Sequence, residues 1–439
     1  MNTYYGKTMD FVRGIKEVTK YQFDTYNIDP SFPAELSNLQ EKDLKIEECF
    51  SRKDFRGEKA FTIDCEDCKD MDDAVSIVKT AKGYRLAVHI ADVSAYVPLG
   101  SELDQIASYR ATSIYLPHLT VPMLPKVLSN GCCSLNPGVS RYTLSVIVHL
   151  NENGEVVRSE ITKGKIRSRV KGVYSEVNKL LSGDIDSTLM EKYSEVYDEL
   201  FIMSDLYRIL RSERIRRGAS VEDSNKPKIS VWKNSIKLSP TREGLAENMI
   251  EEFMIVANRI VAEYLYSNEL PAIFRIQEEK NHMAAYQPTK MHHAELALES
   301  YSHFTSPIRR VADLKIHQVL TMHLNGTDSK EIHRLFDELL VEVCDRATKR
   351  SRTVKQIQDK CERYCYEQYF MIHRNDSYSG KIVGFDRKNR PIVQINRYNI
   401  KVIGYAIING TLGDRYSFRV GVSNKNNELY TSKPCRIAA

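Results

Sequence analysis

The chain has 439 residues, of which 42% are hydrophobic and 28% charged, and its formal net charge is +5. These fractions are typical of a globular protein with two or three domains and exclude a largely disordered chain. No stretch approaches the roughly 18 consecutive apolar residues of a membrane span, the first twenty residues lack the apolar centre of a secretory signal, and the nine cysteines do not form a disulfide pattern. We therefore expect a cytoplasmic protein with no membrane partner.

The first half of the chain predicts a sheet. Residues 1–55 form a polar lead-in with little periodicity, broken by "DPSFP". Residues 61–64, 73–78 and 84–93 are rich in β-branched side chains and predict strands, with a hairpin turn at 79–84. A short helix is expected over 101–111, followed by a proline-punctuated loop over 115–125. Residues 142–166 predict a second hairpin that turns at Asn153-Gly154.

The second half first predicts helices and then strands again. Apolar residues recur every three or four positions over 187–217 and 243–269, which indicates amphipathic helices, and two more helices are expected to begin at Pro307 and to run from Ser329 to His373. From Tyr378 onward five short alternating segments predict a small barrel, for which the OB-fold is the leading candidate. Residues 376–439 carry eleven Lys and Arg against four Asp and Glu, so this module either binds a polyanion or has a solvated basic face.

The segment 61–73, "FTIDCEDCKDMDD", holds six acidic residues within ten positions: Asp64, Glu66, Asp67, Asp70, Asp72 and Asp73. Carboxylates this close repel one another and raise one another's pKa unless a cation compensates. Mg²⁺ prefers oxygen ligands, and two such ions can stabilise the attacking and leaving oxygens of a phosphoryl transfer. The cluster therefore points to a phosphodiester-cleaving centre.

Calcium and zinc motifs do not fit this cluster. An EF-hand that begins at Asp64 would require Gly at its sixth position and Glu at its twelfth, where the chain has Lys69 and Val75. Cys65 and Cys68 form a lone C-x-x-C without a second ligand pair at zinc-finger spacing. A solvated acidic turn remains an alternative on residue type alone.

Taken together, ordered blocks of sequence resemble the ribonuclease II / ribonuclease R (RNB) exoribonuclease family. They are "FTIDCEDCKDMDDAVSI", "LAVHIADVSAYV", "RATSIYLPHLTVPMLPKVLSNGCCSLNPGVSR", "ENMIEEFMIVANRIVAEYL" and "LALESYSHFTSPIRRVADLKIHQ", and the resemblance covers roughly residues 30–375. It implies an α+β fold in which a lead-in (1–55) precedes an RNB-like catalytic domain (56–375) of mixed sheets, long helices and a central RNA channel. A basic OB-like barrel (376–439) follows.

The resemblance also implies an activity and a set of site residues. The activity is processive 3′-to-5′ hydrolysis of single-stranded RNA to nucleoside 5′-monophosphates with Mg²⁺, or Mn²⁺ as the alternative, by a protein we expect to be a monomer. The expected metal ligands are Asp64, Asp70, Asp72 and Asp73, and Asp72 would also help to hold the terminal ribose. Arg309 would contact the scissile phosphate, for which a fixed, bidentate charge is suited.

Two further residues are expected to contact RNA. Tyr115 resembles the family tyrosine that stacks on the 3′-terminal base, an interaction that tolerates every base. Glu362 corresponds to a glutamate that contacts the terminal ribose. The basic run Arg346, Lys349, Arg350, Arg352 and Lys355 either lines the channel or is a solvated helix face.

The sequence departs from the family pattern at three places. No cold-shock domain precedes the signature within this sequence. The helical stretch after "FRIQEEKNHM" has shrunk to a short joint at 278–295, where we expect His292 and His293 to be loop residues and not metal ligands. Glu222 stands where the family commonly has a phenylalanine that wedges against stacked bases. The last two departures motivate an alternative, a catalytically impaired RNA-binding or regulatory protein; a DNA-directed or endonucleolytic enzyme is a third hypothesis.

Overall fold

The computed structural model describes residues 11–44, 46, 52–221, 226–240, 244–423 and 427–437. Its larger part, called the body below, is built on a five-stranded sheet of order β1-β8-β7-β4-β3. The strands are β1 (Lys53–Asp54), β3 (Asp73–Thr80), β4 (Gly83–Ala91), β7 (Ser140–Leu150) and β8 (Val156–Arg167). Both predicted hairpins are confirmed as antiparallel pairs, β3 with β4 and β7 with β8, whereas β1 runs parallel to β8.

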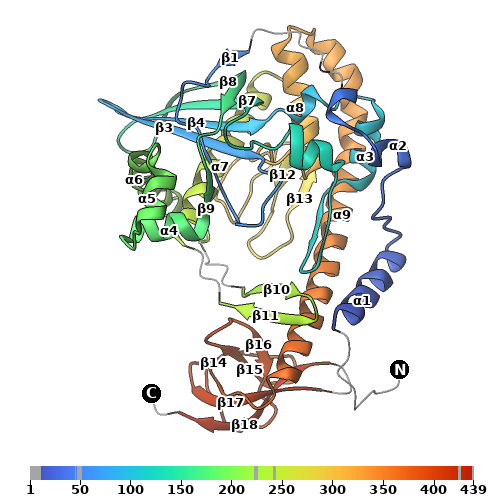
Figure 1. Ribbon diagram of the computed structural model, residues 1–439, viewed down its shortest axis with the longest axis vertical. Helices are drawn as coiled ribbons and strands as arrows, with labels where there is room; N and C mark the ends of the chain where they lie inside the picture. Colours follow the sequence, from blue (N-terminus) through green and yellow to red (C-terminus); the bar gives the residue numbers. More distant parts are fainter. Residues whose placement is uncertain are drawn as a thin grey trace.

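Helices cover this sheet (Figure 1). They are α3 (Glu102–Arg110), α4 (Tyr174–Ser182), α5 (Ser187–Tyr193), α6 (Tyr197–Arg216), α7 (Leu245–Ser267) and α8 (Val311–Leu324). The segment 187–217, expected as one helix, is divided into α5 and α6. Helix α8 begins at Val311 and not at Pro307, because residues 306–310 form a turn whose Ser306 N–H binds the carboxylate of Asp313. No helix among the described residues has the length and hydropathy needed to cross a bilayer.

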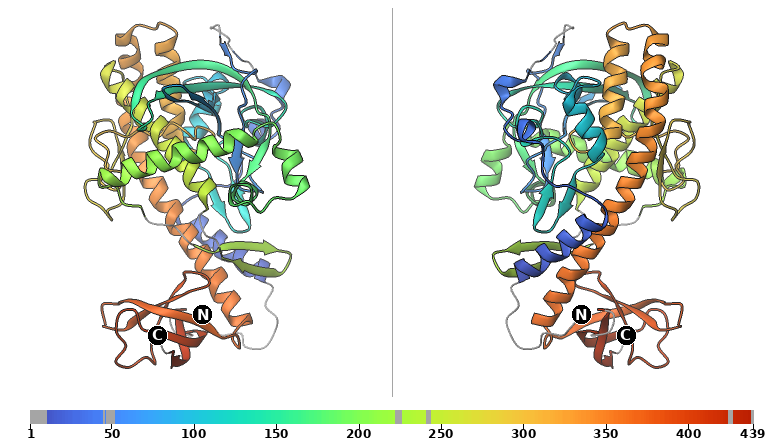
Figure 2. Two further views of the ribbon diagram at one scale, coloured as in Figure 1. Left: turned by 90° about the vertical axis from the view of Figure 1, so that its left-hand side faces the viewer. Right: turned by 90° about the vertical axis from the view of Figure 1, so that its right-hand side faces the viewer.

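Helix α9 (Ser329–Ile372) connects the body to the C-terminal module, as both side views show (Figure 2). Its 44 residues extend for about 66 Å at 1.5 Å per residue. Phe336 and Leu340 lie in the core of the body, Val354 and Ile357 pack with strands β5 and β6, and Phe370 enters the core of the barrel. One helix thus takes part in three hydrophobic cores.

The lead-in contains regular structure that its sequence pattern did not predict. Helix α1 (Phe11–Thr25) buries Phe11, Ile15 and Phe23, which lie on one face of the helix, and it packs along α9. Gly14 permits this close approach, because a Cβ there would lie 1.9 Å from the Tyr364 hydroxyl oxygen. The prediction of little periodicity was therefore wrong for this segment. Short helical turns follow in the lead-in at α2 (Ala34–Ser37) and η1 (Glu41–Asp43). Two further short helical segments lie beyond the lead-in, at η2 (Val93–Ala95) and η3 (Val127–Cys132).

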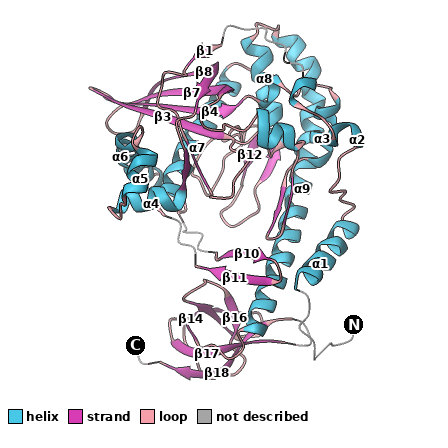
Figure 3. Ribbon diagram, viewed as in Figure 1, coloured by secondary structure: helices cyan, strands magenta, loops and turns pink. Residues whose placement is uncertain are grey.

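The C-terminal module is a closed barrel of five strands, which confirms the five strands expected from the sequence (Figure 3). They are β14 (Tyr378–Phe385), β15 (Pro391–Ile395), β16 (Lys401–Ile403), β17 (Arg415–Val422) and β18 (Leu429–Arg436). The order around the barrel is β14-β15-β16-β18-β17, with β17 pairing back to β14. Such a closed five-stranded barrel agrees with the OB-like expectation.

Four small two-stranded sheets complete the part of the fold that the structure describes. Strand β2 (Thr62–Asp64) pairs with β9 (Lys171–Val173), and β12 (Phe274–Ile276) pairs with β13 (Ala285–Gln287). Strands β5 (Ile114–Leu116) and β6 (Leu119–Val121) form a hairpin inside the segment that was expected to be a loop. The hairpin of β10 (Lys228–Trp232) and β11 (Ser235–Ser239) lies between the body and the barrel (Figure 1).

Candidate active site

The acidic residues belong to the connection between β2 and β3, as predicted, and several hydrogen bonds hold this connection in place. Asp64 ends β2 and Asp73 begins β3. The N–H of Met71 donates to the Ser134 hydroxyl (3.1 Å), and that hydroxyl donates to the carbonyl of Lys69 (2.8 Å). The carbonyl of Asp72 accepts from the N–H of Ala91 in β4 (2.8 Å). The loop is therefore fixed to the sheet on one side and to the 127–135 segment on the other.

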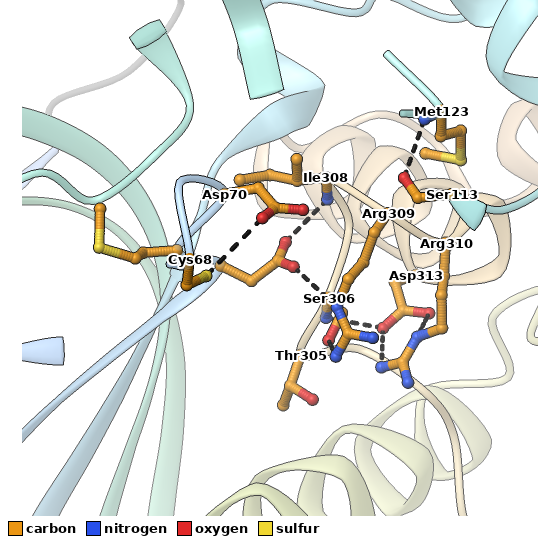
Figure 4. Close-up of polar contacts among 12 residues, drawn as sticks. Cys68, Asp70, Ser113, Met123, Thr305, Ser306, Ile308, Arg309, Arg310 and Asp313 are labelled. Carbon is orange, nitrogen blue, oxygen red and sulfur yellow. Dashed lines mark hydrogen bonds and ion pairs between the residues drawn. The ribbon is translucent and has the colours of Figure 1, made fainter. Parts of the chain in front are cut away.

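Asp72 is the point at which the acidic loop meets the segment that carries Arg309. Its side chain is 3% exposed. One carboxylate oxygen accepts from the N–H of Ile308 (2.8 Å), and the other accepts from Nε of Arg309 (3.2 Å). Arg309 also donates through Nη2 to the Ser306 hydroxyl (2.8 Å), so its guanidinium is held between Asp72 and Ser306 (Figure 4). The structure thus brings together two predicted site residues that lie 237 positions apart in the chain.

The Arg309 segment is held from two sides. The carbonyl of Arg309 accepts from the N–H of Ser113 and from the Thr112 hydroxyl, each at 3.0 Å. Asp313, which is fully buried, accepts from the N–H of Ser306 (2.8 Å) and from the guanidinium of Arg310 (2.6 and 2.9 Å) (Figure 4). These contacts fix the backbone on both sides of Arg309.

Two further predicted residues, Asp70 and Tyr115, also meet at the loop. The sulfur of Cys68 lies 3.7 Å from a carboxylate oxygen of Asp64 and 3.7 Å from one of Asp70, so its single S–H can donate to either. The Tyr115 hydroxyl donates to the second oxygen of Asp70. Tyr115 comes from β5, and its carbonyl accepts from the Gln358 amide of α9 (3.0 Å). Burial, followed by the charges of Asp64 and Asp70, raises the pKa of the Cys68 thiol.

The carboxylates of the loop are electrostatically coupled. Burial raises the pKa of Asp72 to about 8; the charge of Arg309 and the Ile308 N–H oppose this rise, and the charges of Asp73 and Asp70 add to it. Burial and the charge of Asp72 raise the pKa of Asp64, and burial and the charge of Asp64 raise that of Asp73. Several negative charges thus share a poorly solvated space in which a cation would stabilise their ionised forms.

The residues present fit a divalent metal ion. One buried carboxylate oxygen of Asp64 has no hydrogen-bond partner among the described residues, and the donor set consists of carboxylate oxygens, which Mg²⁺ and Mn²⁺ prefer. Within the described ranges, however, no three His, Cys, Asp or Glu side chains already converge as a complete cage. This agrees with the usual binding of Mg²⁺ through one or two carboxylates, with water and substrate phosphate as further ligands.

Glu362 lies elsewhere. It faces a cavity of about 790 Å³ between α9 and the barrel, and its carboxylate lies 3.4 Å from the ammonium of Lys226. Among the described residues, no hydrogen bond or ion pair joins Glu362 to the acidic loop. Its expected ribose contact therefore remains a prediction, and Glu222 lies outside the described residues.

The other candidate residues are engaged in local contacts. Nε2 of His292 lies 2.9 Å from the carbonyl of Glu278, and His293 is buried with its ring 5.7 Å from that of Tyr301. In the basic run, Lys349 pairs with Asp345 and Lys355 with Asp359 along α9. These two pairs support the solvated-face interpretation for those lysines.

Sequence reasoning missed the residues that position the site. Ser134, Ser306 and Asp313 each hold a segment that carries a predicted site residue. Of these, only Asp313 could have been found from local spacing, because it follows Arg310 by three positions at the start of a helix. The partner of Ser134 lies 63 positions away in the chain, and no spacing rule anticipates such a contact.

Comparison with known proteins places this geometry in a family. The RNB domain family model matches residues 52–285 and 281–326. Ribonuclease R 1 of Lactococcus lactis is 32% identical over 416 residues, a match that covers 81% of this chain and 51% of the relative. The chain thus spans about half the length of that curated relative.

Solved structures show the same fold. Mycoplasma genitalium RNase R in complex with ribose-methylated single-stranded RNA superimposes with a TM-score of 0.75 at 23% identity, over 98% of this chain and 76% of that one. Yeast Ssd1, a pseudonuclease, superimposes with a TM-score of 0.63 at 17% identity, over 91% of this chain and 57% of that one. The fold therefore occurs both with and without nuclease activity.

Proposed function

Since the chain belongs to the RNB family, we propose that it is a 3′-to-5′ exoribonuclease that hydrolyses single-stranded RNA to nucleoside 5′-monophosphates. The single observation that carries the proposal is the junction at Asp72. There the coupled carboxylates of the acidic loop, with an unpartnered oxygen on Asp64, meet the guanidinium of Arg309. A set of anionic oxygens beside a positioned arginine is suited to phosphodiester hydrolysis.

In this proposal each residue has a separate task. Asp64, Asp70, Asp72 and Asp73 would hold Mg²⁺ or Mn²⁺, and the bound ions would neutralise the carboxylates, polarise the phosphoryl group and activate water. Arg309, held by Asp72 and Ser306, contacts the scissile phosphate, where negative charge develops as the bond breaks. Tyr115 turns from Asp70 to stack on the terminal base; its side chain is accessible, since the residue is 37% exposed.

The test uses single-stranded RNA with a 5′ label. Incubation with Mg²⁺ is expected to produce a ladder that shortens from the 3′ end, to release nucleoside 5′-monophosphates and to leave a short limit product. Removal of the metal with a chelator should stop the reaction, and readdition should restore it. The proposal fails if no metal-dependent shortening occurs with either Mg²⁺ or Mn²⁺.

A second candidate is an RNA-binding protein that has lost hydrolysis. The departures from the family pattern at Glu222 and at 278–295 motivate it, and the fold is shared with a pseudonuclease. It predicts tight binding of RNA without any product at any metal concentration. A closed circular RNA and a DNA strand in the same assay test the endonuclease and DNA-directed hypotheses.

A further inference from the structure

The only tryptophan of the chain, Trp232, lies at the tip of the β10–β11 hairpin with 72% of its surface exposed. In the antiparallel register Trp232 lies opposite Ser235, Ser230 opposite Lys237, and Lys228 opposite Ser239. Residues that pair directly across two strands project from the same face of the sheet. Trp232, Lys237 and Lys228 therefore share one face of the hairpin, the outer face, with small serines between them.

The opposite face of the hairpin anchors it. Ile236 and Leu238 are buried, and Ile229 and Val231 pack beside them in the hydrophobic core that includes the barrel and the end of α9. At the tip, the side-chain oxygen of Asn234 accepts from the N–H of Val12 in α1 (3.3 Å). The hairpin is therefore held in place by its packed face, and Trp232 is exposed on the opposite face.

The charged side chains of the hairpin are all positive. Residues 226–239 contain four lysines and no acidic residue. Lys226 and Lys228 approach acidic side chains of neighbouring elements, whereas Lys233 and Lys237 have no ion pair with any described residue. An exposed aromatic ring flanked by unneutralised lysines is suited to a single-stranded nucleic acid, because the ring can stack on any base and the lysines can contact phosphates.

The hairpin also lies beside the candidate active site. The ammonium of Lys228 is 3.5 Å from the carboxylate of Asp67 in the acidic loop, and the hairpin separates that loop from the barrel (Figures 1 and 2). Trp232 follows Lys228 by four residues, a distance of about 13 Å along an extended strand. If the 3′ end of an RNA molecule lies at the acidic loop, the nucleotides that precede that end can reach this face of the hairpin.

We propose that the outer face of the β10–β11 hairpin is an accessory binding surface for single-stranded RNA. Trp232 stacks on a base upstream of the reacting end, and Lys233 and Lys237 contact the backbone. The direction assumed here for the RNA, with its 3′ end at the acidic loop, rests on the proposed function, but binding at this face does not require hydrolysis.

Because the chain has one tryptophan, emission excited at a wavelength that its 25 tyrosines barely absorb reports on this surface. The full-length Asp72→Asn variant, without metal, is titrated with a single-stranded RNA of about 20 nucleotides, long enough to span the loop and the hairpin. We expect a saturable change in tryptophan emission that weakens as salt is raised. Saturable RNA binding, measured by the anisotropy of a labelled strand, without any change in emission would overturn the proposal.

Variants in the same Asp72→Asn background complete the test. Trp232→Ala should weaken binding of the labelled strand by about tenfold or more, while Trp232→Phe, which keeps a stacking ring, should retain most of the affinity. Lys237→Ala should reduce both the affinity and its salt dependence, whereas Lys82→Ala, an exposed lysine on the β3–β4 turn, should not.

Unchanged affinity of Trp232→Ala would refute the proposal. So would an emission change that follows protein concentration without RNA, since it would identify the face as a contact between copies of the chain. If the wild-type chain hydrolyses no RNA but Trp232→Ala still loses affinity, the proposed function fails and this inference stands.

Discussion

Replacement of Asp72 by asparagine tests the candidate site most directly. Asparagine has nearly the shape of aspartate, so its side-chain oxygen can still accept from the N–H of Ile308. Its amide group, however, carries no charge for a metal ion and presents a donor to Arg309, which is itself a donor. The change therefore removes charge from the centre of the site while the loop stays attached to the Arg309 segment.

The loss of activity is expected to be large and the loss of stability small. Removal of one preorganised electrostatic group costs up to about 4 kcal/mol of transition-state stabilisation, which corresponds to roughly a 10³-fold lower rate. The free energy of unfolding should change by less than about 1 kcal/mol, because the substitution removes the cost of burying a carboxyl group together with its bond to Arg309, whose side chain is 42% exposed.

The assay compares the rate of 3′ shortening of labelled RNA, the affinity for the same RNA and the melting temperature. Glu66→Gln is the matched control, because Glu66 lies in the same loop with an exposed side chain, and its activity should be unchanged. Cleavage by Asp72→Asn at the wild-type rate would refute the assigned role of Asp72. A large drop in melting temperature would instead show that Asp72 supports the fold.

Three other predictions concern stability, pH and the end of the reaction. Asp92→Asn should lower the free energy of unfolding, measured by thermal denaturation, by about 3–5 kcal/mol, because Asp92 is fully buried between Lys163 and Arg52. The control Glu160→Gln, which removes an exposed ion pair with Lys53, should have no comparable effect. Burial alone would raise the pKa of Asp92, but the two cations outweigh it and hold that pKa well below its usual value. The stabilisation from Asp92 is therefore full above about pH 4 and is lost as the pH falls toward the pKa of Asp92 in the folded protein. Between about pH 5 and 3, the melting temperature of the wild type should therefore fall more steeply than that of Asp92→Asn. Tyr115→Phe should leave the length of the limit product unchanged on a sequencing gel, whereas Tyr115→Ala should change it, because stacking needs the ring and not the hydroxyl; equal products from both variants would contradict this role.

Part of this protein was predictable because local patterns encode it. Alternation over 73–78 and 84–93 identified β3 and β4, Asn153-Gly154 identified the turn into β8, and the spacing of apolar residues identified α7 and α9. Helix α1 was missed although Phe11 and Ile15 are four residues apart, because the polar residues around them dilute the signal. The β10–β11 hairpin was missed as well, since its alternation is short and its outer face is polar.

The sequence by itself determined the chemistry of the acidic loop, because a dense run of carboxylates after a short strand already implies a cation, and it determined the family through ordered blocks. Only the tertiary structure decided which residues share a site. It joined Asp72 to Arg309 and Asp70 to Tyr115, placed Glu362 at a separate cavity and set Trp232 on an open face beside the loop. The physical reason is that such contacts depend on how strands and helices pack across tens to hundreds of residues, and no local pattern carries that information.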